Sequence, residues 1–77
     1  MFPLTITTVT EQLFFGEARS VTFPGSEGEL TVLKNHVPLI TTLSKGIITV
    51  RGEGEDRTFP VAHGLLEVSR DGVIVLM

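Results

Sequence analysis

Residues Gly25 to Leu43 read G-S-E-G-E-L-T-V-L-K-N-H-V-P-L-I-T-T-L and decide the fold class, because they place turn residues between short apolar runs. Ser26-Glu27-Gly28 has the composition of a tight turn. After it, Leu30 and Val32 share one face of a strand, since strand side chains alternate with a period of two. Lys34-Asn35 then turns the chain again. The stretch therefore predicts a β-hairpin followed by a further strand.

The same alternation of apolar residues and turns continues on both sides of this stretch. No segment of ten or more residues shows helical periodicity, so we predict an all-β fold. We expect an antiparallel β-sandwich or flattened barrel of about eight to ten short strands in two sheets. The predicted strands are Leu4–Val9, Glu11–Ala18, Val21–Phe23, Glu29–Leu33, Val37–Leu43, Ile47–Arg51, Thr58–Ala62, Leu66–Val68 and Val73–Leu76.

Several local features of the N-terminal half make specific predictions. Leu4, Ile6 and Thr8 are expected on one face of the first strand. Adjacent aromatics in a strand point to opposite faces, so one residue of the pair Phe14-Phe15 should face solvent or an interface. Gly16 is expected at a bulge or turn.

The C-terminal half makes predictions of the same kind. Pro38 lacks a backbone donor and so belongs on an edge strand or at a strand start. Arg70-Asp71-Gly72 between alternating runs is a strong hairpin signal. The wholly apolar run Val73–Leu76 predicts a strand covered on both faces. The loop Gly52–Arg57 is the most polar stretch and should be solvated.

Length and composition limit the classes of function. The 77 residues have room for one domain, residues 1–77, and the 42% hydrophobic content suffices for a core. The absence of cysteine excludes disulfides and thiolate metal sites. The net charge of −3 and the scattered basic residues disfavour nucleic acid as a partner. No apolar run approaches the roughly 20 residues needed to cross a bilayer, so we expect no direct membrane insertion.

Candidate chemical groups are few and do not form a recognisable site. Glu27 and Glu29 suggest an acid/base pair, but no histidine or pocket-forming aromatic accompanies them in sequence, and exposed turn carboxylates are common. A metal site would need both His36 and His63 plus carboxylates from distant strands. The serines lack a nucleophile context. We predict no catalytic residue, no metal site, no cofactor and no small-molecule substrate.

A longer pattern spans most of the chain. It runs F-x-G-E-A-x-S-V-x-x-P-G-x-E-G-E-x-x-V-L-x-x-H-x-P-L-x-T-x-L-x-x-G from Phe14 to Gly46, and continues as G-x-L-E-V-S-x-x-G-V-x-V-L from Gly64 to Leu76. In this pattern the chain resembles the N-terminal domain of the epsilon subunit of F-type ATP synthases. A match of this length with fixed spacings is highly specific, whereas each glycine or proline dipeptide alone is not.

The resemblance implies a non-catalytic rotor subunit of the central stalk. Its β-sandwich would dock on the gamma subunit and touch the polar loops of the proton-conducting ring of c subunits, so that rotation is coupled to ATP synthesis. The protein would then be peripheral on the energy-coupling membrane through its complex, on the cytoplasmic face in a bacterium or the stromal face in a plastid. The family's C-terminal helical hairpin is expected to be absent because the chain stops at Met77, so no inhibitory or nucleotide-binding role is assigned.

The resemblance also implies an interface. The turn at Glu27 to Glu29 resembles the ring-facing tip, with Glu29 expected to contact the ring. The following stretch resembles the part that faces gamma and the ring. The implied interface residues are Glu29, Thr31, His36, Pro38, Leu39 and Thr41.

Two departures from the family pattern bear on the surface. Lys34-Asn35 stands where Pro-Gly is common, and asparagine preserves the turn because it tolerates a left-handed backbone. Phe15 replaces a small polar residue and is expected to add interface area. Two alternatives stay open: a free-standing β-sandwich that binds a small ligand or carbohydrate, although tryptophan and tyrosine are absent, and a small hydrolase using Glu27 and Glu29.

Overall fold

The computed structural model describes residues 1–77 as nine strands without a helix, which confirms the predicted all-β fold. None of its segments is a helix long and apolar enough to span a membrane. The strands are β1 Phe2–Thr7, β2 Gln12–Ala18, β3 Ser20–Gly25, β4 Gly28–Leu33, β5 Leu39–Leu43, β6 Gly46–Arg51, β7 Arg57–Val61, β8 Gly64–Ser69 and β9 Gly72–Leu76.

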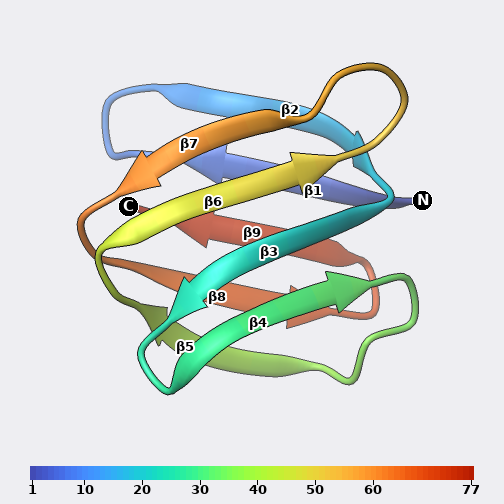
Figure 1. The fold of residues 1–77 in the computed structure, drawn as a ribbon. Helices are drawn as coiled ribbons and strands as arrows, with labels where there is room; N and C mark the ends of the chain where they lie inside the picture. Colours follow the sequence, from blue (N-terminus) through green and yellow to red (C-terminus); the bar gives the residue numbers. More distant parts are fainter.

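The strands form two facing layers (Figure 1). One layer has the order β2-β1-β9-β8-β5, and the other has the order β4-β3-β6-β7. The layers are joined at one corner, where Gly25 of β3 pairs with Leu43 of β5. Neighbouring strands are antiparallel except β1 and β9, which run parallel. This parallel pair places the first and last strands side by side in the middle of one layer, with the N- and C-termini at opposite ends of the pair (Figure 1).

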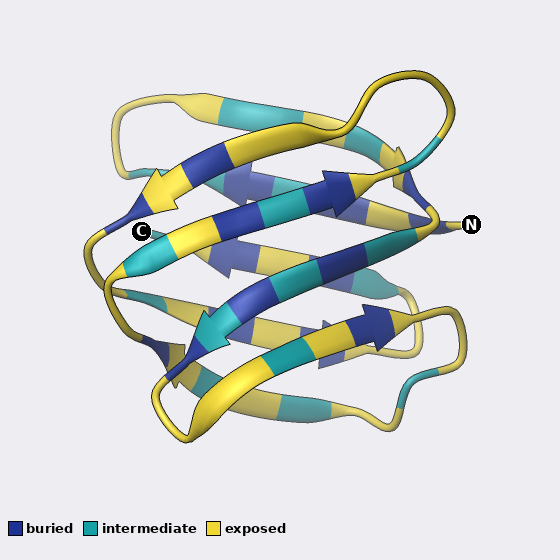
Figure 2. Cartoon of the chain, viewed as in Figure 1, coloured by how far each residue is buried: buried dark blue, intermediate teal, exposed yellow.

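The core lies between the layers and is entirely apolar. Sixteen buried hydrophobic residues form one cluster, and no polar or charged side chain is buried. Figure 2 shows why: buried and exposed residues alternate along the strands, as a period of two requires. Phe23, Ile48 and Leu66 are fully buried at its centre.

The first strand is shorter at its C-terminal end than predicted. It ends at Thr7, because the Thr8 side chain forms a local turn instead of continuing the strand face. Thr8 Oγ1 accepts hydrogen bonds from the backbone N–H groups of Thr10, at 3.2 Å, and Glu11, at 3.1 Å. Such side-chain hydrogen bonds satisfy backbone N–H groups outside the sheet and so compete with strand pairing. The expected position of Thr8 on the core face is therefore wrong.

The predicted irregularity at Gly16 is also wrong. Gly16 lies within β2 and pairs regularly with Leu4. The register of this strand pair shifts instead between Ile6 and Thr7. A Cβ at this position would lie 3.5 Å from the Phe14 ring, which is an ordinary van der Waals distance.

The aromatic pair on β2 behaves as predicted, since Phe15 is exposed and Phe14 turns toward the core. Phe14 meets Phe59 of β7 edge to face, with 6.0 Å between the ring centroids. The Arg57 guanidinium lies 5.3 Å from the Phe14 centroid and 5.2 Å from the Phe59 centroid. These contacts close the seam between the unpaired edge strands of the two layers.

The turn and edge predictions for the central stretch are confirmed. Asn35 has a φ of 68°, and the His36 N–H donates to the Leu33 carbonyl at 3.1 Å. Strand β5 begins at Leu39, so Pro38 precedes it and removes no ladder hydrogen bond. The strand was predicted from Val37 and is two residues shorter at this end, because residues 36–38 form an irregular connection after the turn.

One prediction about β9 fails in an informative way. Only Val73 and Val75 face the core, whereas Ile74 and Leu76 are exposed on the outside of the layer. The apolar run therefore does not mark a strand covered on both sides within this chain. It marks a strand with apolar side chains on its outer surface.

Candidate partner interface

The outer surface of the β2-β1-β9-β8-β5 layer carries large hydrophobic side chains on most of its strands. Strand periodicity puts them opposite the core, since their neighbours in sequence are the buried residues. We call these residues the apolar face. They and their exposed fractions are Phe15 75%, Ile40 69%, Ile74 50%, Leu76 45% and Leu65 43%.

The strand registers arrange the apolar face in two rows. One row crosses the whole layer, because each of its residues pairs directly with the next: Phe15, Thr5, Ile74, Glu67 and Ile40. The second row contains Thr7, Leu76, Leu65 and Thr42. Directly opposed side chains on a sheet lie in contact range. The exposed hydrophobic residues therefore share one surface. Leu65 and Leu76 pair directly, while Thr5 and Glu67, the single charge in the longer row, lie between the apolar residues of that row.

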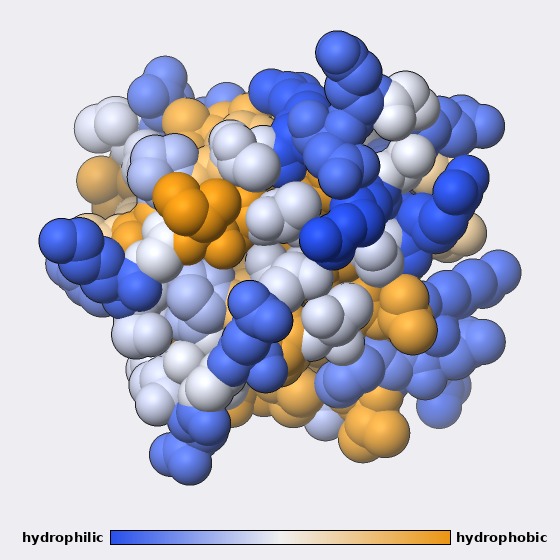
Figure 3. All heavy atoms as spheres, viewed as in Figure 1, coloured by the Kyte–Doolittle hydropathy of each residue, from blue (hydrophilic) through white to orange (hydrophobic).

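The opposite layer has a different outer surface. Its registers align one threonine from each strand, and we call this set the threonine row: Thr31, Thr22, Thr49 and Thr58. Thr22 Oγ1 and Thr31 Oγ1 lie 3.0 Å apart, and Arg51 Nη1 donates to Thr22 Oγ1 at 3.0 Å. Figure 3, which looks onto this side, shows hydrophilic and weakly polar side chains with only separate apolar ones.

The hairpin between β3 and β4 ends in a rigid acidic tip. Gly28 has a φ of 123°, and a Cβ on Gly25 would lie 2.7 Å from the Gly28 carbonyl oxygen. The Ser26 N–H donates to the Thr42 carbonyl at 3.1 Å, and the two side-chain oxygens of these residues lie 2.8 Å apart. These bonds tie the tip to the end of β5. Glu27 and Glu29 both project from it into solvent.

The structure does not bring all the predicted interface residues together. Glu29 and Thr31 lie on the outside of β4, with Thr31 in the threonine row. His36 and Pro38 lie at the other end of that strand, beside a pocket. Leu39 and Thr41 point inward from β5 and are half-buried. The outward residues of that strand are Ile40 and Thr42.

The sequence reasoning missed three residues of the apolar face: Leu65, Ile74 and Leu76. Of the apolar face, Phe15 is the residue that the sequence analysis singles out as added interface area. Strand alternation in the sequence does indicate an outward Leu65, because this residue precedes Leu66 and Val68, which share the core face.

The carboxylates of the tip do not form part of a wider polar cluster. No group of three or more His, Asp or Glu side chains has an arrangement that could hold a metal ion. Arg51 and Asp56 form the only ion pair, with 3.8 Å between nitrogen and oxygen, and it is far from the tip in sequence. Glu27 and Glu29 are thus solvated charges available to a partner.

Comparison with known proteins agrees with the resemblance found in the sequence. Residues 1–77 match the family described as the ATP synthase, Delta/Epsilon chain, beta-sandwich domain. The ATP synthase epsilon chain of Herminiimonas arsenicoxydans is 42% identical over 73 residues, which cover 92% of this chain and 52% of that protein. ATP synthase epsilon chain 2 of Burkholderia orbicola is 43% identical over 75 residues, covering 95% and 49%. The chain thus spans about half the length of the curated relatives it matches.

Solved structures show the same architecture. A chain in the OSCP/F1/c-ring structure of the Euglena gracilis mitochondrial ATP synthase superposes with a TM-score of 0.90 at 26% identity, covering 99% of this chain and 49% of that one. A chain in the central stalk/c-ring structure of the Tetrahymena thermophila enzyme has a TM-score of 0.84 at 15% identity, covering 97% and 61%, and supports the fold alone. On the sequence pattern, the two-layer fold and these matches, the chain belongs to the ATP synthase delta/epsilon family and carries the N-terminal β-sandwich of an epsilon subunit.

Proposed function

We propose that this chain is a non-catalytic central-stalk subunit of an F-type ATP synthase. It docks on the gamma subunit through the apolar face and presents the acidic tip to the ring of c subunits, and so helps to couple proton translocation to ATP synthesis. It is held at the energy-coupling membrane through these partners, on the cytoplasmic side in a bacterium or the stromal side in a plastid.

The observation that carries this proposal is the apolar face. Contiguous exposed hydrophobic surface on a small domain marks an interaction site, whereas scattered single residues do not. Fully burying a side chain such as Ile or Phe contributes about 1.5–3 kcal/mol relative to leaving it exposed. Covering Phe15, Ile40 and Ile74 is therefore enough to anchor a partner, because a few well-packed residues dominate most interfaces.

The acidic tip supports a second, polar contact. Its backbone is fixed by the Ser26 bonds to Thr42, and both glutamates remain exposed. Side chains on a rigid turn lose little additional freedom on binding, so even a small contact with a polar loop of the ring is favoured. The family resemblance assigns this contact to Glu29.

The proposed role requires a stiff domain and does not require the domain to catalyse a reaction. A core of sixteen apolar residues between two layers has the packing density of a protein interior and transmits strain with little compression. Load applied at the tip can pass through the β3–β4 hairpin to the layer that carries the apolar face, because Gly25 and Leu43 join the two layers directly beside the tip.

The test compares two matched isoleucines on opposite outer surfaces. Ile74 lies on the apolar face and is 50% exposed, and Ile47 lies on the other layer and is 53% exposed. Ile74→Lys should weaken binding to purified gamma subunit by at least about ten-fold, or about 1.4 kcal/mol, because it places a charge in the covered row. Ile47→Lys should leave binding unchanged. Binding is measured by biolayer interferometry, and thermal unfolding of each variant confirms that it is folded.

Equal loss in the two variants would show that the apolar face is not the docking surface. Failure of the parent chain to associate with gamma subunit or ring at micromolar concentrations would reject the proposed function itself.

A further inference from the structure

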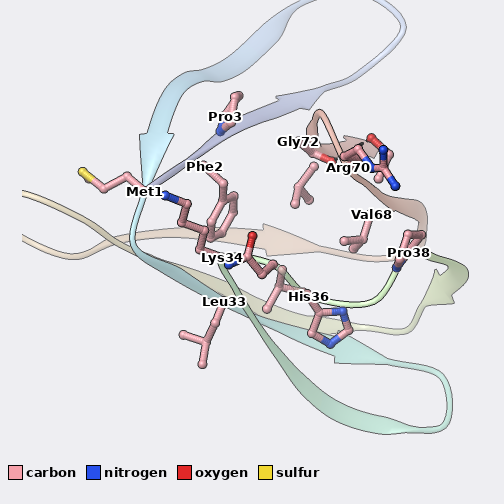
Figure 4. A pocket seen from close by; sticks show the side chains of 14 residues that line it. Met1, Phe2, Pro3, Leu33, Lys34, His36, Pro38, Val68, Arg70 and Gly72 are labelled. Carbon is pink, nitrogen blue, oxygen red and sulfur yellow. Dashed lines mark hydrogen bonds between the residues drawn. The ribbon is translucent and has the colours of Figure 1, made fainter.

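A pocket of about 340 Å³ opens at the end of the sandwich where β4 ends and where β8 turns into β9. We call it the end pocket. Its volume is at the lower limit for small-molecule sites. Figure 4 shows Phe2 and Val68 on either side of the hollow, with Lys34 and His36 from the β4–β5 connection and Arg70 from the β8–β9 turn around it. The apolar face lies on another surface, so the end pocket is a separate feature.

The interior of the end pocket is apolar. Phe2, Val32, Val68 and Val73 line it, and all four belong to the hydrophobic core. An apolar group that enters the pocket therefore continues the core of the protein. Such burial is favourable in proportion to the area removed from water.

The ionisable side chains that line the end pocket are all basic or imidazole: Lys34, His36 and Arg70. The chain has nine acidic residues and a net charge of −3, yet none of these acids lines the pocket. Asp71 follows Arg70 in the turn but is exposed and outside the lining. The local charge is thus opposite in sign to that of the whole protein, and it favours an anion.

The Lys34 and Arg70 side chains have no partner within the chain, whereas His36 Nδ1 lies 2.8 Å from the Val37 carbonyl oxygen. The only ion pair is between Arg51 and Asp56, and neither Lys34 nor Arg70 makes a side-chain hydrogen bond. The turn that carries Arg70 is itself fixed, because Ser69 Oγ accepts from the Asp71 N–H at 3.3 Å and donates to the Gly72 carbonyl at 3.2 Å. The pocket therefore offers free cationic groups on an ordered rim.

We propose that the end pocket binds an anionic amphiphile: a carboxylate or phosphate group on an unbranched apolar chain. The anionic group lies between Lys34 and Arg70, where charge-assisted hydrogen bonds form. The apolar chain lies against Phe2, Val68 and Val73. This inference does not depend on docking to the gamma subunit.

The test is a titration of the isotope-labelled 77-residue chain, followed by amide chemical shifts at constant pH and ionic strength. The probes are octanoate, octyl phosphate, octan-1-ol, acetate and octyltrimethylammonium. Octanoate, octyl phosphate or both should give saturable shifts at Lys34, Ser69 and Gly72. The alcohol, which lacks the charge, and acetate, which lacks the chain, should bind at least five-fold more weakly. The stronger of the two anionic probes identifies the headgroup.

Variants assign the binding to the basic groups. Lys34→Gln combined with Arg70→Gln should weaken binding at least five-fold while the spectrum elsewhere is retained, because both residues are exposed. The matched control combines Arg19→Gln with Lys45→Gln, which removes two exposed charges outside the pocket lining and should leave affinity unchanged.

Three results would overturn the proposal. These are an equal loss in the control variant, equally strong binding of the octyltrimethylammonium cation, and shifts confined to the apolar face around Ile74 and Phe15. Absence of saturable shifts with both anionic probes would also reject it.

Discussion

The two outer surfaces of the sandwich have the same geometry and opposite chemistry. On one layer, registers align Thr31, Thr22, Thr49 and Thr58 across four strands. On the other, the same kind of register aligns Phe15, Thr5, Ile74, Glu67 and Ile40 across five strands. In the threonine row, the hydroxyls of Thr22 and Thr31 are hydrogen-bonded within the protein, whereas the apolar row has no covering group in this chain.

This difference distinguishes the residue property that specifies the fold from the residue property that specifies the partner. Threonine and isoleucine are both β-branched and both favour strands, so either row is compatible with the sheet beneath it. Their polarity is what differs. The threonine row is suited to water, and the apolar row is suited to a second protein. Substitutions on these surfaces should therefore alter binding and stability independently of each other.

The largest effect is expected from removing a core side chain that supports both surfaces. Phe23→Ala should lower the free energy of unfolding by about 3–5 kcal/mol, because Phe23 is fully buried and its loss leaves a cavity. A domain of 77 residues has about 4–11 kcal/mol of stability in total, so this loss is a large fraction of it. Chemical denaturation followed by circular dichroism measures the loss.

Phe15→Ala is the matched control on the apolar face. Since Phe15 is 75% exposed, the substitution should change stability by less than about 0.5 kcal/mol. It should weaken binding to gamma subunit instead. A large loss of stability with Phe15→Ala would mean that the apolar face stabilises the isolated fold, and the separation of folding from docking would then be wrong.

The sequence predicted those parts of the fold that depend on local chemistry. The turn at Asn35, the hairpin at Arg70-Asp71 and the exposure of Phe15 all follow from residue type and strand alternation within a few positions. The errors at Thr8 and Gly16 are of the same local kind. At Thr8 a hydroxyl bond to the backbone closes a turn, and at Gly16 the strand continues in regular pairing with Leu4, whereas the sequence allowed either backbone conformation at both positions.

The apolar row was not predictable in the same way, because it depends on pairings between distant segments. Thr5 meets Ile74 only through the parallel pairing of the first and last strands. The wholly apolar run of β9 was interpreted as a strand buried on both faces. That interpretation takes every apolar residue of the run as buried, whereas Ile74 and Leu76 are exposed on the outer surface of the layer.

A smaller effect is expected in the threonine row. Thr22→Val keeps the branched shape but removes the oxygen that accepts from Arg51 and pairs with Thr31. It should cost about 0.5–1.5 kcal/mol in the free energy of unfolding. The matched substitution is Thr5→Val on the apolar face, where the side chain makes no hydrogen bond and lies between Phe15 and Ile74. It should be neutral for stability and preserve binding to gamma subunit. The same cost at both positions would show that the hydroxyl bonds do not stabilise the threonine row.

The smallest effect on stability is expected at the acidic tip, which lies outside both rows. Glu29 is exposed and forms no ion pair, so Glu29→Lys should change the free energy of unfolding by less than about 0.5 kcal/mol. If the tip meets the ring, reversing this charge should weaken binding to the isolated ring of c subunits and leave binding to gamma subunit unchanged, because the apolar face is intact.

Glu53→Lys, in the exposed loop between β6 and β7, controls for a general effect of net charge. Ring binding that is equal for parent, Glu29→Lys and Glu53→Lys would remove Glu29 from the interface and limit docking to the apolar face.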